Sequence, residues 1–209
     1  MNRRTALKNL TMSLGYTVAA PTIFNMLSAC TAEADTWSPL FLSSEEKHMV
    51  TQLVDIILPA SDTPGALDVN VPQFLDMMYQ DIEIKENQDQ FKKGASIFSK
   101  KFKTQFGSEV AKGDKEQFET LLASYFDISD EETATVFKEQ RLPIEKLTNP
   151  KIENRALYKF LISVRTYTLF GYFTSEKVGE TVLNYDPVPG VHISCMPLED
   201  VLNGRAWSL

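Results

Sequence analysis

The sequence predicts an all-α protein, with a single compact helical domain followed by an irregular C-terminal arm rich in Pro and Gly. Apolar residues recur with the 3.6-residue period of a helix, helix-capping residues precede the periodic segments, and no run of alternating apolar and polar residues is long enough for a sheet. The chain has 209 residues, of which 43% are hydrophobic and 23% charged. A chain of this size can bury a core of its own.

The first predicted helix begins at a capping box, in which Ser43 is the N-cap and Glu46 is the third helical residue. Pro59 ends this helix, because proline cannot continue the hydrogen-bond ladder. After a turn-rich loop, the Val-Pro pair at 71–72 opens a second helix, since proline suits a first turn. Its predicted apolar stripe is Phe74, Leu75, Met78 and Ile82.

A third helix is predicted from phenylalanines at helical spacing, and it ends at Gly107. Lysines interleaved with aromatic residues are also typical of nucleic-acid binding. The phenylalanines share one face and would be used by the core, so we interpret the lysines as a solvated surface. The predicted apolar face is Phe91, Ala95, Phe98, Phe102 and Phe106. The lysines are Lys92, Lys93, Lys100, Lys101 and Lys103.

Three further helices are predicted before the arm. Two of them begin at capping boxes, Asp114 with Gln117 and Ser129 with Glu132. After a connector at 143–150, the strongest helix spans about Asn154 to Phe173 and is apolar on more than one side. Such a helix lies at the centre of a domain or under a partner. A short final helix, capped by Thr174 or Ser175, extends to Leu183.

The first 29 residues are predicted to be an export signal and not part of the fold. Residues 2–8 resemble a twin-arginine signal, with Arg3 and Arg4 as the arginine pair. The apolar stretch at 10–20 contains several polar residues and is shorter than the roughly 20 residues that a spanning helix needs. We therefore expect the twin-arginine translocase to export the chain.

The signal ends at a sequence that resembles a bacterial lipobox, Leu-Ser-Ala-Cys at 27–30. In a lipobox the cysteine is acylated and becomes the mature N-terminus, so lipidated Cys30 would hold the protein on a membrane. Cleavage after Ala32-Glu33-Ala34, which has small residues at its first and third positions, with soluble release, is the alternative. With Cys30 lipidated, Cys195 is unpaired and is expected to be a small buried residue; without lipid, a Cys30–Cys195 disulfide is the alternative.

The expected organisation is a signal peptide at 1–29, a tether at 30–40 and a helical domain at 41–209. Loss of the signal would remove three basic residues and no acidic one, and so would change the net charge from −7 to −10. An acidic protein repels nucleic acid, which we exclude as a partner. We expect a periplasmic lipoprotein anchored to a membrane.

No pattern for cofactor binding or catalysis is present in the sequence. It lacks the Gly-rich dinucleotide fingerprint, the Gly-x-Ser-x-Gly nucleophile elbow and the haem-attachment motif Cys-x-x-Cys-His. Glu45 and His48 have the Glu-x-x-His spacing of di-iron bundles, but a second copy is absent and the other histidine, His192, follows a Pro-Gly turn. We therefore expect no catalytic, cofactor-binding or metal-binding residue in this chain.

Three segments resemble a known family. They are IILPASDTPGA at 56–66, the arm from Gly171 to Gly190 with GYFTSE and YDPVPG, and GRAW at 204–207. Together they resemble the small subunit, subunit 3, of membrane-bound gluconate 2-dehydrogenase, over about residues 40–209. The resemblance implies a non-catalytic subunit that escorts and stabilises a large FAD-dependent subunit of the glucose–methanol–choline type. It also implies that a cytochrome c subunit, carrying haem c, often passes electrons onward.

The residues of the arm are consistent with binding a partner. A twin-arginine signal serves cargo that crosses a membrane already folded, as a flavin-loaded partner must. Aromatic residues and arginine are the residues that interfaces favour. The candidate contact residues are Tyr172, Phe173, Tyr185, Asp186, Arg205 and Trp207. One alternative is that these residues hold the arm on its own helices; another is that the chain is an autonomous periplasmic lipoprotein enzyme or small-ligand-binding module.

The export prediction can be tested with Arg3→Lys plus Arg4→Lys, which keeps the positive charge and removes the arginine pair. We expect the chain to stay in the cytoplasm together with any flavoprotein that it carries. Fractionation of cells producing both chains measures this. Normal export of the flavoprotein in the double variant would contradict the escort role.

Overall fold

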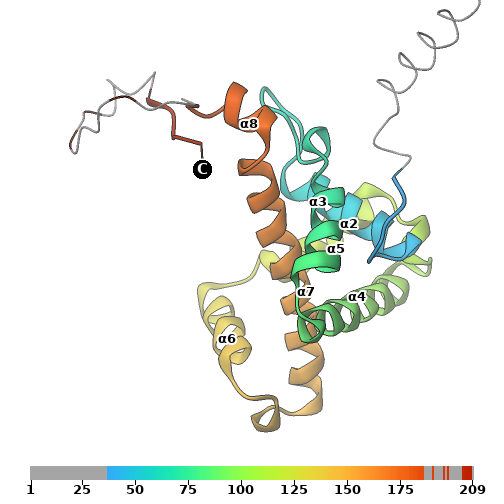
Figure 1. Ribbon diagram of the computed structural model, residues 1–209. Coiled ribbons are helices and arrows are strands. Elements are labelled where there is room, and N and C mark those ends of the chain that lie inside the picture. The colour runs from blue at the N-terminus through green and yellow to red at the C-terminus, as the bar shows by residue number, and fades with distance from the viewer. Residues whose placement is uncertain (1–36, 186–189, 191–194, 196, 198–203, 209) are drawn as a thin grey trace, which may run out of the picture. The chain divides into compact units, whose positions relative to one another are not determined.

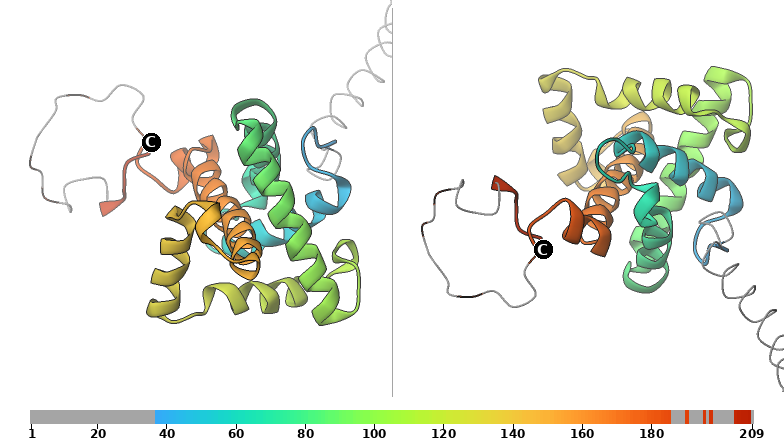
Figure 2. Two further views of the ribbon diagram at one scale, coloured as in Figure 1. Left: turned by 90° about the horizontal axis from the view of Figure 1, so that it is seen from below. Right: turned by 90° about the horizontal axis from the view of Figure 1, so that it is seen from above.

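Helix α7 (Asn149–Phe173) runs through the domain, and α2, α3, α4, α6 and α8 all contact it (Figure 1). The computed structural model describes residues 37–185, 190, 195, 197 and 204–208. The helices named here all belong to one compact unit, Pro39–Leu209. Two further views show α4 crossing α7 (Figure 2).

The described residues form helices and no strand; Asn184 and Trp207 make an isolated parallel bridge. The all-α prediction is therefore confirmed. The α-helices are α2 (Ser44–Ile57), α3 (Val71–Met77), α4 (Lys85–Phe106), α5 (Lys115–Phe126), α6 (Asp130–Arg141), α7 (Asn149–Phe173) and α8 (Glu176–Thr181). The short helices are η2 (Leu67–Val69), the π-helix η3 (Met78–Ile82), η4 (Val110–Lys112) and η5 (Ile144–Lys146).

The predicted helix ends are largely confirmed. Each of the three capping boxes forms, with Ser43, Asp114 and Ser129 accepting a hydrogen bond from the backbone N–H of the third helical residue. Helix α4 ends at Gly107, whose φ of 72° lies in the left-handed region that glycine adopts without strain. Helix α7 begins earlier than predicted, at Asn149, because Pro150 lies in its first turn, where proline needs no N–H donor.

The second predicted helix changes its geometry after about two turns. Helix α3 passes directly into the π-helix η3, whose wider turn shifts every later side chain around the axis. Tyr79 therefore takes the buried position, with 3% of its surface exposed, while Ile82 is 67% exposed. The prediction that Ile82 belongs to the apolar stripe is wrong, because it extrapolated a 3.6-residue period through this segment.

The core is centred on the crossing of α4 and α7. The ring of Phe160 lies 4.9 Å from that of Phe91 and 6.0 Å from that of Phe98, centroid to centroid. A Cβ atom at Gly94 would come within 2.4 Å of both the Ala156 carbonyl oxygen and the Phe160 Cβ. The two helices can approach this closely only because residue 94 has no side chain.

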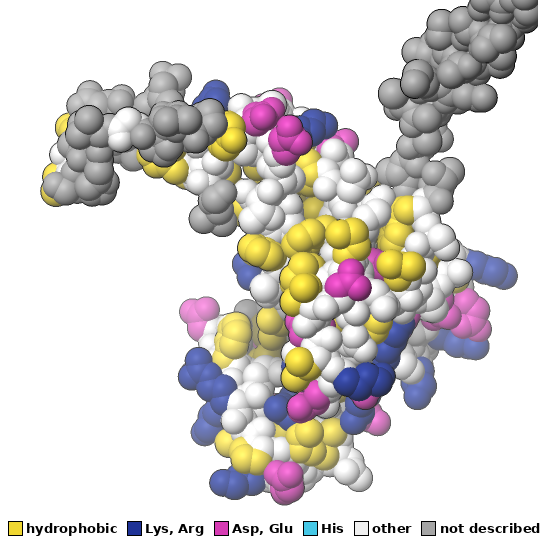
Figure 3. Space-filling model, viewed as in Figure 1, with side chains coloured by type: hydrophobic (Ala, Val, Ile, Leu, Met, Phe, Trp, Pro, Cys, Tyr) yellow, Lys and Arg dark blue, Asp and Glu magenta, His cyan; other side chains and the backbone are white. Residues whose placement is uncertain are grey.

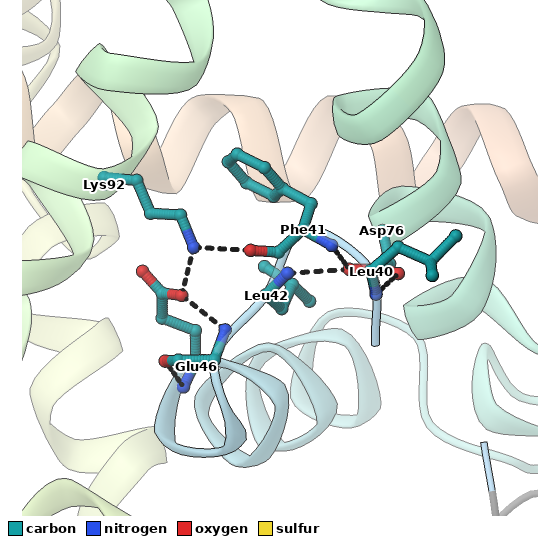
Figure 4. A network of polar contacts seen from close by, with 7 residues as sticks. Leu40, Phe41, Leu42, Glu46, Asp76 and Lys92 are labelled. Carbon is teal, nitrogen blue, oxygen red and sulfur yellow. Dashed lines mark hydrogen bonds and ion pairs between the residues drawn. The ribbon is translucent and has the colours of Figure 1, made fainter. Parts of the chain in front are cut away.

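The segment that precedes α2 is held by the buried carboxylate of Asp76 on α3 (Figure 4). This carboxylate accepts hydrogen bonds from three successive backbone N–H groups, those of Leu40, Phe41 and Leu42, at 2.8, 3.0 and 2.8 Å. A buried charge that accepts three donors is well compensated. The interaction fixes the place where the chain enters the domain.

One of the lysines on α4 is not part of a solvated surface. Lys92 Nζ donates to the Phe41 carbonyl oxygen at 2.7 Å, pairs with Glu46 at 2.5 Å and lies 4.1 Å from the centre of the Phe41 ring (Figure 4). The prediction of a solvated lysine is therefore wrong for Lys92. This lysine holds the segment that precedes α2 to α4, as Asp76 holds it to α3. Lys93, Lys100 and Lys101 are exposed as predicted.

The close contact at Gly94 predicts an unusual result for Gly94→Ala. In an exposed helix this change stabilises by about 1 kcal/mol. Here we expect the free energy of unfolding to fall by about 2 kcal/mol, because the methyl group must push α4 away from α7. Urea denaturation followed by circular dichroism measures the change.

The matched control is Ser96→Ala, at an exposed position of the same helix. We expect its free energy of unfolding to stay within about 0.5 kcal/mol of that of the unchanged protein. An unchanged or higher stability of Gly94→Ala would show that the two helices have room for a side chain.

Candidate partner-binding surface

Hydrophobic side chains gather on the surface formed by α3, η3 and the C-terminal half of α7 (Figure 3). The Phe74 ring lies 5.7 Å from that of Phe170, edge to face, and covers Gly171, where a Cβ atom would meet Phe74 Cδ1 at 2.6 Å. Met77 is 53% exposed and Phe170 47% exposed. We call this surface the α3–α7 face, made of Phe74, Met77, Ile82, Ile84, Tyr167 and Phe170.

The carboxylate of Glu83 lies beside these apolar residues, and its hydrogen bonds hold it in place. It accepts from the Tyr167 hydroxyl at 2.5 Å and from the Asn87 amide at 2.6 Å. Burial and the bond to Glu83 raise the pKa of Tyr167, and burial raises the pKa of Tyr79, which bonds Ser163, to about 12. Both phenols therefore stay protonated at neutral pH, and Tyr167 remains a donor.

The C-terminal end of the chain returns to the end of α8 and is held there by Asn184, which is 5% exposed. The Asn184 N–H donates to the Ala206 carbonyl oxygen at 2.8 Å, and its own carbonyl oxygen accepts from Ser208 N–H at 2.8 Å. Its side-chain amide donates to the Arg205 carbonyl oxygen at 2.7 Å. These three bonds fix the positions of the neighbouring residues Tyr185 and Trp207.

The candidate contact residues of the arm are exposed to different extents. Phe173, Tyr185 and Trp207 are exposed by 39%, 55% and 51%. Arg205 is also exposed, and its Nη1 lies 3.5 Å from the Thr181 carbonyl oxygen. Each of these four side chains offers surface to a partner. Asp186 lies outside the described residues, as do Arg3, Arg4 and Cys30.

Tyr172 has an internal role in the domain. Its side chain is buried, with 6% of the residue exposed, and its hydroxyl donates to the Pro64 carbonyl oxygen at 2.9 Å. We therefore remove Tyr172 from the set that offers surface to a partner. The bond joins the loop at 56–66 to the start of the arm, so two segments that carry the family resemblance meet at the end of α7.

The candidate metal ligands do not come together. His48 Nε2 lies 3.0 Å from the Gly113 carbonyl oxygen and its ring meets that of Phe118 edge to face, while the Glu45 carboxylate accepts from Ser99 Oγ at 2.6 Å. Within the part of the chain that the structure describes, no three His, Cys, Asp or Glu residues are grouped as metal ligands. His192 lies outside that part.

Two further features bear on the predictions. Cys195 is exposed, so the expectation that it is a small buried residue is wrong. Among residues 37–185 and the short described pieces that follow, every helix is too short or too polar to cross a lipid bilayer.

A cavity of about 750 Å³ lies between α6 and α7, with Lys101 of α4 also lining it. Half of the residues that line it are charged, and they include Glu139, which is 8% exposed and pairs with Lys151 at 2.9 Å. Ile128 and Tyr158 supply an apolar part of the wall. A small ligand with both polar and apolar groups is the kind of molecule that such a lining fits.

Sequence reasoning missed most of the α3–α7 face. Helical periodicity assigns Phe74 and Ile82 to the apolar stripe of the second predicted helix, and it does not mark Met77 or Ile84. The breadth of the apolar surface of α7 was the available signal, since a helix with several apolar sides is either central or covered by a partner. Both readings hold here, because α7 is central in the domain and also exposes Phe170.

The fold and the surface together define the class of protein: a helical domain whose central helix, α7, ends in exposed aromatic residues. The chain belongs to the gluconate 2-dehydrogenase subunit 3 family, whose family model matches residues 44–190. The match spans α2 to α8 and ends at Gly190, so it covers two of the three segments that carry the resemblance and not the GRAW segment at 204–207. Comparison with curated proteins and with solved structures found no match.

Proposed function

We propose that this chain is a non-catalytic accessory subunit of an exported FAD-dependent dehydrogenase that acts on a sugar or sugar acid. In this proposal it escorts the large flavin-containing subunit of the glucose–methanol–choline type, stabilises it and anchors it to a membrane. FAD belongs to the large subunit, and haem c belongs to a cytochrome c subunit. The family membership supports association with other gluconate dehydrogenase subunits.

The observation that carries the proposal is the exposed α3–α7 face. Met77, Ile82 and Ile84 are more than half exposed, and Phe170 nearly half. Apolar and aromatic side chains gathered at one place on an acidic protein leave a large area of unfavourable contact with water. Covering this area with a partner would remove that cost, as at the centre of protein interfaces.

The position of this face supports the same proposal. Phe170 and Phe173 are three residues apart and therefore neighbours on α7, so the α3–α7 face continues towards Tyr185 on the arm. The Pro64–Tyr172 bond brings the loop at 56–66 to this end of the helix. The segments that resemble the family therefore meet beside the exposed aromatic residues, where a partner common to the family would bind.

The export and anchoring parts of the proposal depend on the N-terminal residues. Arg3 and Arg4 would direct the chain to the twin-arginine translocase, and acylated Cys30 would anchor it on the periplasmic side of a membrane. Tryptic mass spectrometry of the membrane fraction tests the anchor directly. A mature N-terminus other than a lipidated Cys30 would remove this part of the proposal and leave the subunit role standing.

The subunit role is tested by co-purification from membranes and by one double variant, Met77→Ser with Phe170→Ser. The unchanged chain should co-purify with a flavin-containing chain, seen as a flavin absorption spectrum. The double variant should weaken the complex by about 2 kcal/mol or more, roughly 30-fold in Kd, because it removes two apolar anchors. Binding to the purified flavoprotein measures the difference.

The matched control is Phe137→Ser on α6, where the phenylalanine is 51% exposed but lies away from the α3–α7 face. It should bind the flavoprotein as tightly as the unchanged chain. Equal loss of binding in both variants would indicate general destabilisation. Retained binding in the Met77 and Phe170 variant would show that the partner sits elsewhere.

A second candidate function is favoured by the 750 Å³ cavity between α6 and α7. The chain would then be an autonomous protein that binds a small molecule with polar and apolar groups. Purification of the chain alone, free of flavin and bound to a small molecule that mass spectrometry detects, would support this function over the subunit role.

A further inference from the structure

A pocket of about 290 Å³ lies where the arm leaves α8. Phe173, at the end of α7, and Tyr185, on the arm, supply its aromatic walls. Glu176 and Glu180 line it from successive turns of α8, and Ser208 closes it from the returning C-terminal segment. Three separate segments of the chain therefore build this pocket.

The walls of the pocket are held in position by the polypeptide itself. Asn184 fastens the C-terminal segment through bonds to Ala206 and Ser208, and Tyr185 follows directly after it. Ser175, at the start of α8, donates its hydroxyl to the Tyr172 carbonyl oxygen at 2.7 Å. A pocket whose walls are fixed before binding loses less conformational entropy when it is filled.

The electrostatics of the pocket favour a cation. Neither Glu176 nor Glu180 has a hydrogen-bond or ion-pair partner among the residues that the structure describes, and no described lysine or arginine lines the pocket. The C-terminal end of the 25-residue helix α7 adjoins it, and its last turn carries no basic residue. The N-terminal end of α8 adjoins it too, so the two helix dipoles oppose each other there and the two carboxylates supply the negative charge.

The aromatic walls favour a planar cation over a compact one. A guanidinium group stacks on aromatic rings and at the same time donates in a fork to carboxylates, whereas an ammonium group acts as a point charge. The volume is just below the roughly 300–1,000 Å³ of sites for whole small molecules. It suits one long side chain better than a free cofactor.

We propose that this pocket receives an arginine side chain of the flavin-containing partner subunit. The inference rests on the proposed function and makes it more specific. Phe173 belongs both to this pocket and, through its neighbour Phe170, to the edge of the α3–α7 face. The arginine would thus set the orientation of the partner at the rim, while the apolar face supplies the buried area.

The test is the double variant Glu176→Gln with Glu180→Gln, which keeps the shape of the pocket and removes both charges. Its Kd for the flavoprotein should rise about tenfold or more at low ionic strength, and the dependence of Kd on salt should become weaker. The matched control is Glu116→Gln with Glu119→Gln, two exposed residues of α5, which changes the net charge equally and should leave Kd unchanged.

A second measurement needs no partner. The chain alone is titrated with N-acetyl-arginine amide while the ring proton resonances of Phe173 and Tyr185 are followed by NMR. The arginine probe should shift them, N-acetyl-lysine amide should shift them less, and the Glu176 and Glu180 double variant should abolish the response. This readout does not depend on the complex.

The outcomes separate this inference from the subunit role. A complex that forms with unchanged Kd in the glutamine variant, together with no shift of the ring resonances, would overturn the arginine pocket and leave the subunit role intact. Failure of the unchanged chain to bind any flavoprotein would overturn both. Self-association of the chain that disappears in the glutamine variant would assign the pocket to a second copy and overturn the inference.

Discussion

The close contact between α4 and α7 at Gly94 determines how the rest of the domain is arranged. It brings the rings of Phe91 and Phe160 together and occupies one side of α7 over much of its length. Helix α3 occupies another side, again over a glycine, since Phe74 covers Gly171. With both sides occupied, the exposed aromatic residues of α7, Phe170 and Phe173, lie near its C-terminal end, where the candidate surface is found.

Local chemistry made most of the fold predictable. Capping boxes, the left-handed glycine at 107 and helical periodicity depend on neighbouring residues only, so they can be read from sequence. The π-helix at 78–82 departs from the 3.6-residue period on which that reading depends. Tyr79 is buried there and Ile82 is exposed, the reverse of what the period predicts. The contacts of Lys92 could not be predicted from neighbouring residues either, because its partner Phe41 lies 51 residues away in the sequence.

The candidate site was predicted less completely than the fold. Composition pointed to the arm, and four of its proposed contact residues are indeed exposed: Phe173, Tyr185, Arg205 and Trp207. The larger part of the surface comes from α3, η3 and α7, and only tertiary packing decides which of their apolar residues face outwards. Tyr172 is the opposite case: it is an expected contact residue that is buried, and its hydroxyl donates to the Pro64 carbonyl oxygen.

The carboxylate of Asp76 determines how the domain responds to a pull on the segment that precedes α2. Any tension on the chain before residue 37 reaches the domain at Leu40–Leu42, where three N–H groups are bound to Asp76 and the Phe41 carbonyl oxygen to Lys92. The load therefore passes sideways into α3 and α4 before it reaches the first turn of α2. Such a pull therefore does not unwind α2 from its first turn. It acts instead on the packed core as a whole.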